Sequence, residues 1–317
     1  MSDHDLVQEL HTAVRNDFCT FFARCFTQLV SEEELQMGWH VELMASKLVA
    51  VYEGRIRRLA VNVPPRHLKS LICSVAYPAW CLGHNPSATI MCVSYAHELS
   101  EKHARDCRAI MMSEWYRKLF PETRLDSARP AAHNLLTTAG GCRYASSVDG
   151  VLTGRGAGTI IIDDPMKPDE AASETERERV NRWYDQTLLS RLNNKKTGAI
   201  VLIMQRLHED DLTGHVLQQG GWEHVRIPAI AEEDEEHRCE TPWGPKVFRR
   251  KRGEALQPER ESLEDLAELK RDMGSYAFAG QYQQAPAPAG GGWVQEAWFP
   301  RYELHQRPET FDRVVQS

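Results

Sequence analysis

No long apolar run occurs in this sequence of 317 residues. A helix that crosses a membrane needs roughly 20 consecutive apolar residues, and no segment approaches that length. The first residues, MSDHDLVQEL, are acidic, whereas a secretory signal begins with a basic segment and continues with an apolar one. We therefore expect a cytoplasmic protein that has no membrane partner.

Clustered cysteines are absent as well. Eight cysteines are scattered along the chain, no CxxC pair occurs, and several lie inside apolar segments such as Thr89–Ser94. A zinc site or a disulfide framework needs closely spaced cysteines. The pattern indicates reduced thiols, most of them buried.

An excess of positive charge is also lacking, since 38 lysines and arginines stand against 45 acidic residues and the net charge is −7. This excludes a protein coated in nucleic-acid-binding surface, although a local patch suffices to neutralise phosphates. The densest basic segment follows the acidic run Glu232–Glu236 and contains Lys246, Arg249, Arg250, Lys251 and Arg252. Two solvated loops of opposite sign and a DNA-contacting patch both fit this pattern.

What the sequence does contain is an ordinary globular composition, 42% hydrophobic and 26% charged, and an alternation of short apolar runs with longer helical ones. Strands are predicted at Leu59–Val63, Thr89–Ser94, Thr159–Asp163 and Ala199–Met204. Helices are predicted at Ser70–Leu82, Glu98–Ser113, Asp169–Leu192 and Asp211–Gln219. Apolar strands separated by helices imply an α/β fold whose mostly parallel sheet is covered on both faces. Closer strand signals at Asn134–Ala145 predict an inserted hairpin.

Composition divides the chain into four segments. Residues 1–50 are predicted to be helical, and residues 51–227 to contain the α/β core. Residues 228–284 are predicted to form a small lid-like subdomain of charged loops and two short helices. These helices are expected near Ser262–Met273 and Ser275–Gln283. Residues 285–317 begin with a Pro/Gly-rich linker and are too few for a further domain.

The segment LAVNVPPRHLKSLI, residues 59–72, reads as an apolar strand, a short loop and a helix opened by Lys69 and Ser70. Such an arrangement binds a nucleoside triphosphate, because backbone N–H groups and a lysine reach the phosphates and a hydroxyl ligates Mg²⁺. The usual pattern G-x-x-x-x-G-K-[ST] would place glycines at Val63 and Leu68, and both are missing. Taken alone, the segment fits an ordinary strand–helix turn better.

A second motif, GTIIIDDP at residues 158–165, ends a buried strand in Asp163 and Asp164. Ligands of open α/β sheets bind at this end of the strands. In a P-loop enzyme the first acid holds Mg²⁺, and the second, more often glutamate, orients or deprotonates the attacking water. A solvated turn explains the two acids in isolation, but their pairing with Lys69 and Ser70 favours an NTPase.

A third strand ends at Gln205, whose amide is placed to contact a γ-phosphate. Either Asp210 or Asp211 can cap the helix that follows. Together with His208 these acids form a less favoured candidate for a metal site.

The segments VNVPPRHLKS, SYAHELSEKHARD, TGRGAGTIIIDDP and MQRLHEDDLTG occur in this order. From about Trp39 to Phe299 the chain resembles the large terminase subunit of tailed bacteriophages and related prophages. The resemblance implies an additional-strand P-loop ATPase that pumps double-stranded DNA into a preformed capsid, as a ring at the portal vertex in the host cytoplasm. It also implies a portal protein and a small terminase subunit as partners, and ATP and Mg²⁺ as ligands.

The resemblance assigns roles to single residues. The phosphate-loop lysine and serine fall on Lys69 and Ser70, the magnesium acid on Asp163 and the catalytic acid on Asp164. The motif that couples hydrolysis to movement begins near Gln205. Relatives more often have threonine followed by Arg-Trp-His there, and this chain reads Gln-Arg-Leu-His.

Further matches lie around the loop. Nucleotide contacts are implied for Arg66, His67 and Leu68, and Arg66 matches an arginine that is common in the family. Trp39 and His40 fall in the region that resembles the adenine pocket of the family, although a core tryptophan explains them equally well.

Arg155 lies in a Gly-Arg-Gly segment shortly before the magnesium strand. Similar proteins place a charge-stabilising arginine in this neighbourhood, and it often reaches the ATP of a neighbouring subunit. We expect Arg155 to be that arginine finger, with Arg66 as its rival.

The family normally continues into an RNase H-like nuclease whose first strand carries a metal-binding aspartate. Residues 311–317, FDRVVQS, resemble the start of that strand, and the sequence ends where the aspartate is expected. Two-metal DNA cleavage is therefore expected to be absent.

Three other functions stay open at this stage. A two-metal nuclease would use Asp163, Asp164, Asp210 and Asp211, but it leaves the strand–loop–Lys-Ser arrangement unexplained. A superfamily 2 helicase needs a second RecA-like domain, for which the remainder after Ile227 is short. A non-hydrolysing P-loop scaffold is compatible with the missing glycines.

Overall fold

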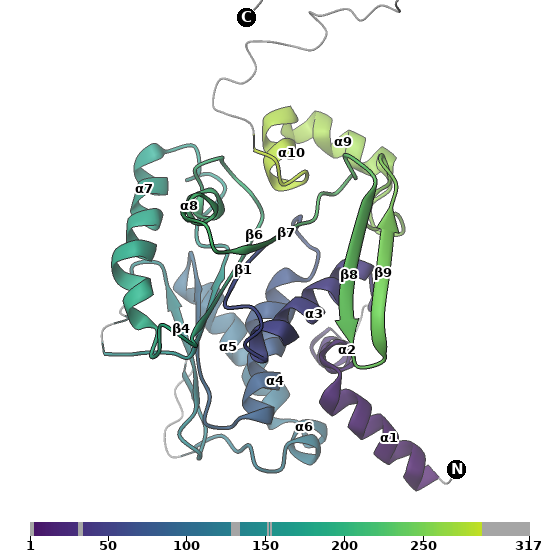
Figure 1. Ribbon diagram of the computed structural model, residues 1–317, viewed down its shortest axis with the longest axis vertical. Helices are drawn as coiled ribbons and strands as arrows, with labels where there is room; N and C mark the ends of the chain where they lie inside the picture. The colour runs from purple at the N-terminus through teal and green to yellow at the C-terminus, as the bar shows by residue number, and fades with distance from the viewer. Residues whose placement is uncertain (1–2, 31–33, 128–133, 151, 153, 287–317) are drawn as a thin grey trace, which may run out of the picture.

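The computed structural model describes residues 3–30, 34–127, 134–150, 152 and 154–286. Seven strands form one central sheet, in the order β3-β4-β2-β5-β6-β1-β7, and helices cover both of its faces (Figure 1). Most of the expected linker and the expected start of a nuclease strand, from residue 287 onward, lie outside the described residues. None of the described helices is long and apolar enough to cross a membrane.

Six of the seven strands run parallel to one another, and β3 is antiparallel to β4, which confirms the predicted α/β class. The strands are β1 (Arg58–Asn62), β2 (Thr89–Ser94), β3 (Asn134–Leu136), β4 (Cys142–Ser147), β5 (Thr159–Asp163), β6 (Ala199–Met204) and β7 (Glu223–Arg226). Strands β2, β5 and β6 have the predicted bounds, and the predicted hairpin is the antiparallel pair β3 and β4. The edge strand β7 was not predicted, because three of its four residues, EHVR, are polar.

Strand β6 lies between β1 and β5 and brings the carboxyl ends of all three to one edge of the sheet. Asn62 is level with Met204, and Asp163 is level with Ile203. The strand that precedes Lys69 and the strand that ends in Asp163 are thus separated by one inserted strand. This order is the additional-strand arrangement of P-loop NTPases.

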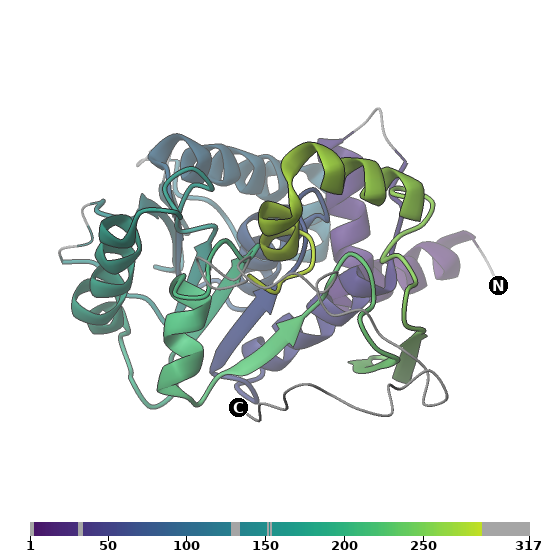
Figure 2. The same cartoon turned by 90° about the horizontal axis from the view of Figure 1, so that it is seen from above.

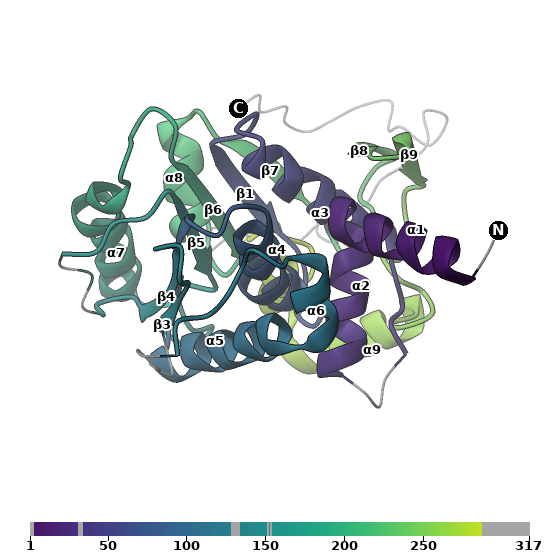
Figure 3. The same cartoon turned by 90° about the horizontal axis from the view of Figure 1, so that it is seen from below.

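Two hydrophobic cores hold the helices against the sheet (Figure 3). One face carries α3 (Trp39–Tyr52), the π-helical η1 (Leu71–Ala76), α4 (Tyr77–His84) and α5 (His97–Met112), with α1 (Asp3–Asn16), α2 (Phe18–Leu29) and α6 (Glu114–Leu119) outside them. The other face carries α7 (Glu174–Trp183), η2 (Tyr184–Leu188), η3 (Leu189–Arg191) and α8 (Leu212–Gln219). Helix α7 begins later than predicted, because the Ser173 hydroxyl accepts the N–H of Glu176 and caps the helix there.

The segment expected to be lid-like contains a β-hairpin that the sequence analysis missed. Strands β8 (Glu235–Thr241) and β9 (Gly244–Arg250) pair antiparallel and pack against α3. The two expected helices follow as α9 (Leu263–Met273) and α10 (Ser275–Gln281). In Figure 2 the central strands run from the lower edge of the view toward α10, which lies over their carboxyl ends.

Opposite charges join the two strands of this hairpin. Arg249 pairs with Glu236 at 3.0 Å, and Arg250 pairs with Glu235 at 2.8 Å. Further ion pairs join Lys251 to Asp234 and Lys246 to Glu42. The expectation of two solvated loops is therefore wrong. Cross-strand charge pairs stabilise strands that lack an apolar alternation, and they largely neutralise the densest basic segment.

The turn after β6 is built around a buried ion pair. The Arg206 Nε atom lies 3.0 and 2.9 Å from the two carboxylate oxygens of Asp211. Asp211 is fully buried and also accepts the N–H of Gly214, so it caps α8. Asp210, the other candidate for this cap, is exposed.

Replacing Asp211 with alanine should lower the free energy of unfolding by about 3 to 5 kcal/mol, because a buried arginine loses its counter-charge. The matched control is Asp210→Ala, which removes an exposed acid and should change stability by no more than about 0.5 kcal/mol. Urea unfolding followed by circular dichroism measures both. Equal effects of the two substitutions would contradict this account of the turn.

Candidate functional site

The loop between β1 and η1 keeps the shape of a phosphate loop without its glycines. Leu68, at a position where the usual pattern has glycine, has φ +63°, and Arg66 has φ +65°. Glycine adopts such left-handed backbone freely, whereas another residue costs on the order of 1 kcal/mol. The Leu68 side chain packs on the larger core, and this contact offsets part of that cost. A search for the glycine pattern would therefore miss this loop, although its backbone has the left-handed conformation that glycine usually adopts.

Hydroxyl groups from the helix after this loop hold the first acid of the pair. Ser70 Oγ donates to Asp163 Oδ1 at 3.0 Å, and Ser74 Oγ donates to Asp163 Oδ2 at 2.7 Å. Only 1% of Asp163 is exposed. Ser74 was not singled out in the sequence, although it follows Ser70 by one helical turn and so faces the same way.

The second acid is held by the phosphate-loop lysine. Lys69 Nζ lies 2.9 Å from Asp164 Oδ2, and it also donates to Gln205 Oε1 at 3.3 Å. The backbone N–H of Gln205 donates to Asp164 Oδ1 at 3.3 Å. Three predicted site residues, which follow or end three different strands, therefore contact one another at one edge of the sheet.

A buried arginine and a buried histidine lie behind the acids, and the sequence analysis identified neither. Arg143 on β4 is fully buried and donates from Nη2 to the Ser74 carbonyl at 3.0 Å. Its Nε and Nη1 atoms have no hydrogen-bond partner among the described residues. His103 Nδ1 lies 3.7 Å from Asp163 Oδ2, and burial lowers the pKa of His103 to about 4. At neutral pH the histidine is uncharged, so Arg143 is the permanent cation behind Asp163.

Burial disfavours the ionised form of both acids. It raises the pKa of Asp163, and hydrogen bonds from Ser74 and Ser70 together with the charge of Lys69 oppose the rise. Burial likewise raises the pKa of Asp164, where Lys69 opposes the rise and Asp163 adds to it. A further cation at this site would favour the ionised forms of both carboxyl groups.

The oxygen atoms fit a divalent cation. The Ser70 hydroxyl and the Asp163 carboxylate, which lie 3.0 Å apart, come from the loop and from the neighbouring strand end. Hydroxyl and carboxylate oxygens are ligands that Mg²⁺ prefers. We therefore assign Ser70 and Asp163 as the residues able to hold it.

Trp39 and His40, expected near an adenine pocket, take part in packing. The ring of Trp39 stacks on His237 with centroids 4.8 Å apart, and the Arg250 guanidinium lies 5.6 Å from its centre. Only 1% of His40 is exposed, and its ring lies 5.3 Å from that of His67. Burial lowers the pKa of His40 to about 3 and that of His67 to about 4, so both rings are neutral. Trp39 is partly buried against the larger core, and its assignment to an adenine pocket stays a prediction.

A cavity of about 510 Å³ adjoins the phosphate loop on the side of α2 and the lid-like segment. Its lining includes Phe26, Leu35, Gln36, Arg66, Gln257 and Arg260. The Gln257 amide donates to the Gln36 carbonyl at 3.2 Å, which joins two distant segments of the wall. Of the described cavities, this is the one that includes phosphate-loop residues, so it is the better candidate for a base and ribose.

Arg155 lies outside the cluster around Lys69. Its guanidinium is 5.0 Å from the centre of the Tyr144 ring, and its Nη1 donates to Asn134 Oδ1 at 3.4 Å. These partners belong to β4 and to the edge strand β3. Arg155 therefore does not reach the acids of its own chain here, and its assignment as an arginine finger stays a prediction, as does that of Arg66.

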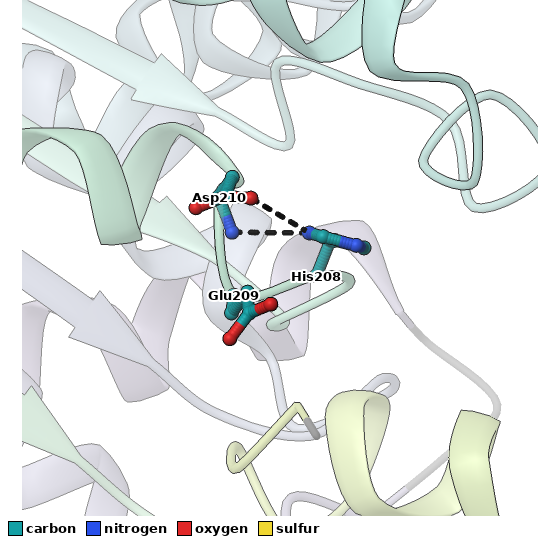
Figure 4. A group of neighbouring side chains, drawn as sticks. All are labelled: His208, Glu209 and Asp210. Atoms are coloured by element: carbon teal, nitrogen blue, oxygen red, sulfur yellow. Dashed lines mark hydrogen bonds and ion pairs between the residues drawn. The ribbon is translucent and has the colours of Figure 1, made fainter. Parts of the chain in front are cut away.

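The residues around His208 do not make a convincing metal site (Figure 4). His208, Glu209 and Asp210 place one ligand atom each within 4.8 Å of one another. The His208 Nδ1 atom, however, already accepts the backbone N–H of Asp210 at 3.1 Å. Asp211, the fourth acid of the alternative nuclease cluster, is committed to Arg206 and to the α8 cap.

None of the known protein-family models matches this chain, and none of the curated proteins does. Among solved structures, a mutant of the large-terminase ATPase domain of Thermus phage P74-26 aligns with a TM-score of 0.48 and 12% identity, over 83% of this chain and 98% of that one. The large terminase of bacteriophage HK97 gives 0.44 and 13%, over 67% of this chain and 43% of that one.

A large terminase from a thermophilic bacteriophage, solved in complex with ADP, gives a TM-score of 0.44 and 8% identity, over 74% of this chain and 52% of that one. This chain therefore spans about half the length of the HK97 protein and of this third terminase. At these TM-scores, the function of the chain rests on the geometry of its own site.

Replacing Asp163 with asparagine should raise the midpoint of thermal unfolding at pH 7.5. The folded state raises the pKa of Asp163, so the ionised carboxylate destabilises the fold at neutral pH. An uncharged amide can still accept one serine hydroxyl at its oxygen and donate from its nitrogen to the oxygen of the other. The difference between variant and wild type should shrink as the pH falls toward 4, because Asp163 then takes up a proton. Differential scanning calorimetry checks this, and a lower midpoint at pH 7.5 would contradict it.

Proposed function

We propose that this chain is the ATP-hydrolysing motor domain of a DNA-packaging terminase, which drives double-stranded DNA into a viral procapsid. One observation carries the ATPase part of the proposal. The ammonium group of Lys69 lies 2.9 Å from the carboxylate of Asp164, although their strands β1 and β5 are separated by β6. The order of the four sequence motifs supports the terminase part.

Each of these residues has a separate role in phosphoryl transfer to water. Lys69 and the N–H groups of the loop bind the terminal phosphates, and Ser70 and Asp163 hold Mg²⁺. When bound, Mg²⁺ neutralises charge on the phosphate oxygens. Asp164 accepts a hydrogen bond from the attacking water and aligns it with the γ-phosphorus.

Lys69 also controls when Asp164 is available. In the structure the ammonium group of Lys69 contacts Asp164 Oδ2 and Gln205 Oε1. A bound γ-phosphate competes for the same ammonium group, because two negative oxygens attract it more strongly than a shared carboxylate. Lys69 then leaves Asp164 free to orient water and releases the Gln205 amide. Gln205 thereby reports the presence of the γ-phosphate to the turn after β6.

Assembly into a ring explains the position of Arg155. Its guanidinium lies against β3 and β4, at the edge of the sheet and away from the acids of its own chain. From that edge it can contact the ATP of a neighbouring subunit at the portal. We include the portal protein and the small terminase subunit as partners, on the strength of the sequence resemblance.

The competing functions fit the site less well. In a two-metal nuclease Asp211 would bind metal, yet both of its oxygens accept from Arg206. A non-hydrolysing scaffold has no use for an acid beside the magnesium acid, yet Asp164 is held by Lys69 and the Gln205 N–H. Hydrolysis therefore accounts for more of the arranged groups than either alternative.

Replacing Asp164 with asparagine should lower kcat for ATP hydrolysis by about 10²- to 10⁴-fold, because the group that aligns water is lost. Binding of ATP should persist, since Lys69 and Ser70 stay in place. Lys69→Ala should lose both binding and turnover, and Lys118→Ala, on the far surface, should lose neither. A phosphate-release assay and a fluorescent-nucleotide titration separate these cases. An Asp164→Asn protein that turns over normally would rule out this mechanism.

Replacing Arg155 with alanine should abolish turnover in the assembled ring while ATP still binds. Mixing Arg155→Ala subunits with Lys69→Ala subunits should restore part of the activity, because an intact site then meets an intact arginine from its neighbour. The matched control mixes Arg66→Ala subunits with Lys69→Ala subunits. This mixture should not regain activity. If no mixture recovers phosphate release, Arg155 does not act across a subunit boundary.

A further inference from the structure

A basic hollow lies at the end of the sheet opposite the phosphate loop. The hollow has a volume of about 920 Å³ and is lined by residues that precede or begin β1, β6 and β7. The lining includes Arg55, Arg57, Arg58, Lys195, Tyr184 and Trp222. We call it the basic hollow, and we count Lys196, next to Lys195, with its rim.

Its positive charge is not neutralised by neighbouring acids. None of the ion pairs found in the described part of the chain includes Arg57, Arg58, Lys195 or Lys196. The single carboxylate of the lining, Glu223, is paired with Lys47 at 2.5 Å. The hollow thus presents four unpaired cations on a chain whose net charge is −7. The basic segment of β9, by contrast, is paired with acids along its length.

The two arginines are oriented by the backbone of the neighbouring strand. Arg57 Nη1 donates to the Lys196 carbonyl at 2.5 Å, and Arg58 Nη1 donates to the Gly198 carbonyl at 3.0 Å. These bonds tie the start of β1 to the start of β6 and hold both guanidinium groups at one place. A fixed cluster of guanidinium and ammonium groups favours an anion with several charges.

The aromatic residues of the hollow offer little open ring surface, because Tyr184 is buried and Trp222 is only partly exposed. Tyr184 is 2% exposed, and Trp222 packs on the core beneath α7 and α8. Proteins that bind single strands need open aromatic faces on which bases stack. A ligand here would contact mainly cationic side chains. Recognition would therefore involve phosphates and would not depend on base sequence.

We propose that the basic hollow binds the sugar-phosphate backbone of double-stranded DNA through Arg57, Arg58, Lys195 and Lys196. The choice of duplex DNA as ligand rests on the proposed packaging function. The strands that begin at the hollow, β1 and β6, end at Asn62, which the loop with Lys69 follows, and at Met204, which Gln205 follows. DNA and nucleotide therefore bind at opposite ends of the same two strands, and each strand is a short rigid link between them.

The test compares two double variants that remove equal charge. Lys195→Gln/Lys196→Gln neutralises the hollow, and its side chains make no hydrogen bond in the described structure, so folding should be preserved. Arg249→Gln/Lys251→Gln neutralises the paired hairpin and is the matched control. Fluorescence anisotropy with a labelled 30-base-pair duplex gives Kd from low to moderate salt, and phosphate release without DNA gives the basal ATPase activity.

The hollow variant should bind duplex DNA at least about tenfold more weakly at low salt. Its slope of log Kd against log salt should be smaller by about two, because each lost phosphate contact removes about 0.9. The control should match the wild type. Basal ATP hydrolysis should be unchanged in both variants, since neither touches the nucleotide site.

Several results would overturn the proposal. These are an equal loss in the hairpin control, an unchanged salt slope in the hollow variant, or tighter binding of single-stranded DNA or RNA than of duplex. A wild-type protein that hydrolyses ATP but does not bind duplex DNA would overturn the proposal that the hollow binds DNA. The ATPase assignment would then remain. A protein that binds duplex DNA through the hollow but releases no phosphate would overturn the proposed ATPase function. The proposal that the hollow binds DNA would then remain.

Discussion

The site depends on the partners of two adjacent carboxylates, the buried Asp163 and the partly exposed Asp164, whose charged forms burial disfavours. Burial raises the pKa of Asp163 and of Asp164, and repulsion between them adds to the effect on Asp164. Lys69 and two serine hydroxyls oppose this effect of burial. The phosphate loop, the helix after it and the ends of β5 and β6 are therefore held together by electrostatics as well as by the sheet. In the proposed ATPase, a triphosphate with its cation would bind where both carboxylates already have polar or charged partners.

The sequence predicted the parts of the structure in which local pattern and environment agree. Strands β2, β5 and β6 lie in the buried centre of the sheet, so their uninterrupted apolar runs set their bounds. The phosphate loop was found from a strand followed by Lys69 and Ser70, whereas its glycine pattern is absent. Asp163, Asp164 and Gln205 could be placed because parallel strands bring their carboxyl ends to one edge.

The features that were missed depend on partners far away in the chain. The hairpin β8–β9 is stabilised by charge pairs between its strands, and such a pattern reads locally as a loop. Arg143 lies near Asp163 because β4 pairs with β2, and it bonds to the carbonyl of Ser74. This pairing of distant segments cannot be inferred from the local sequence. Trp39 was placed near the nucleotide by resemblance alone, and its packing on His237 and beside Arg250 depends on a hairpin far away in the chain.

The turn after β6 is tied to the last described helix by a single side chain. The Arg206 N–H donates to Gln284 Oε1 at 2.9 Å, and Gln284 is 1% exposed. Gln284 thus joins the residue next to Gln205 to the point from which the chain continues beyond α10. Because Arg206 follows Gln205 directly, a shift of this turn would also shift Gln284, and a shift of Gln284 would move the turn. The amide of Gln284 therefore fixes the position of the strand-end turn relative to the end of the lid-like segment.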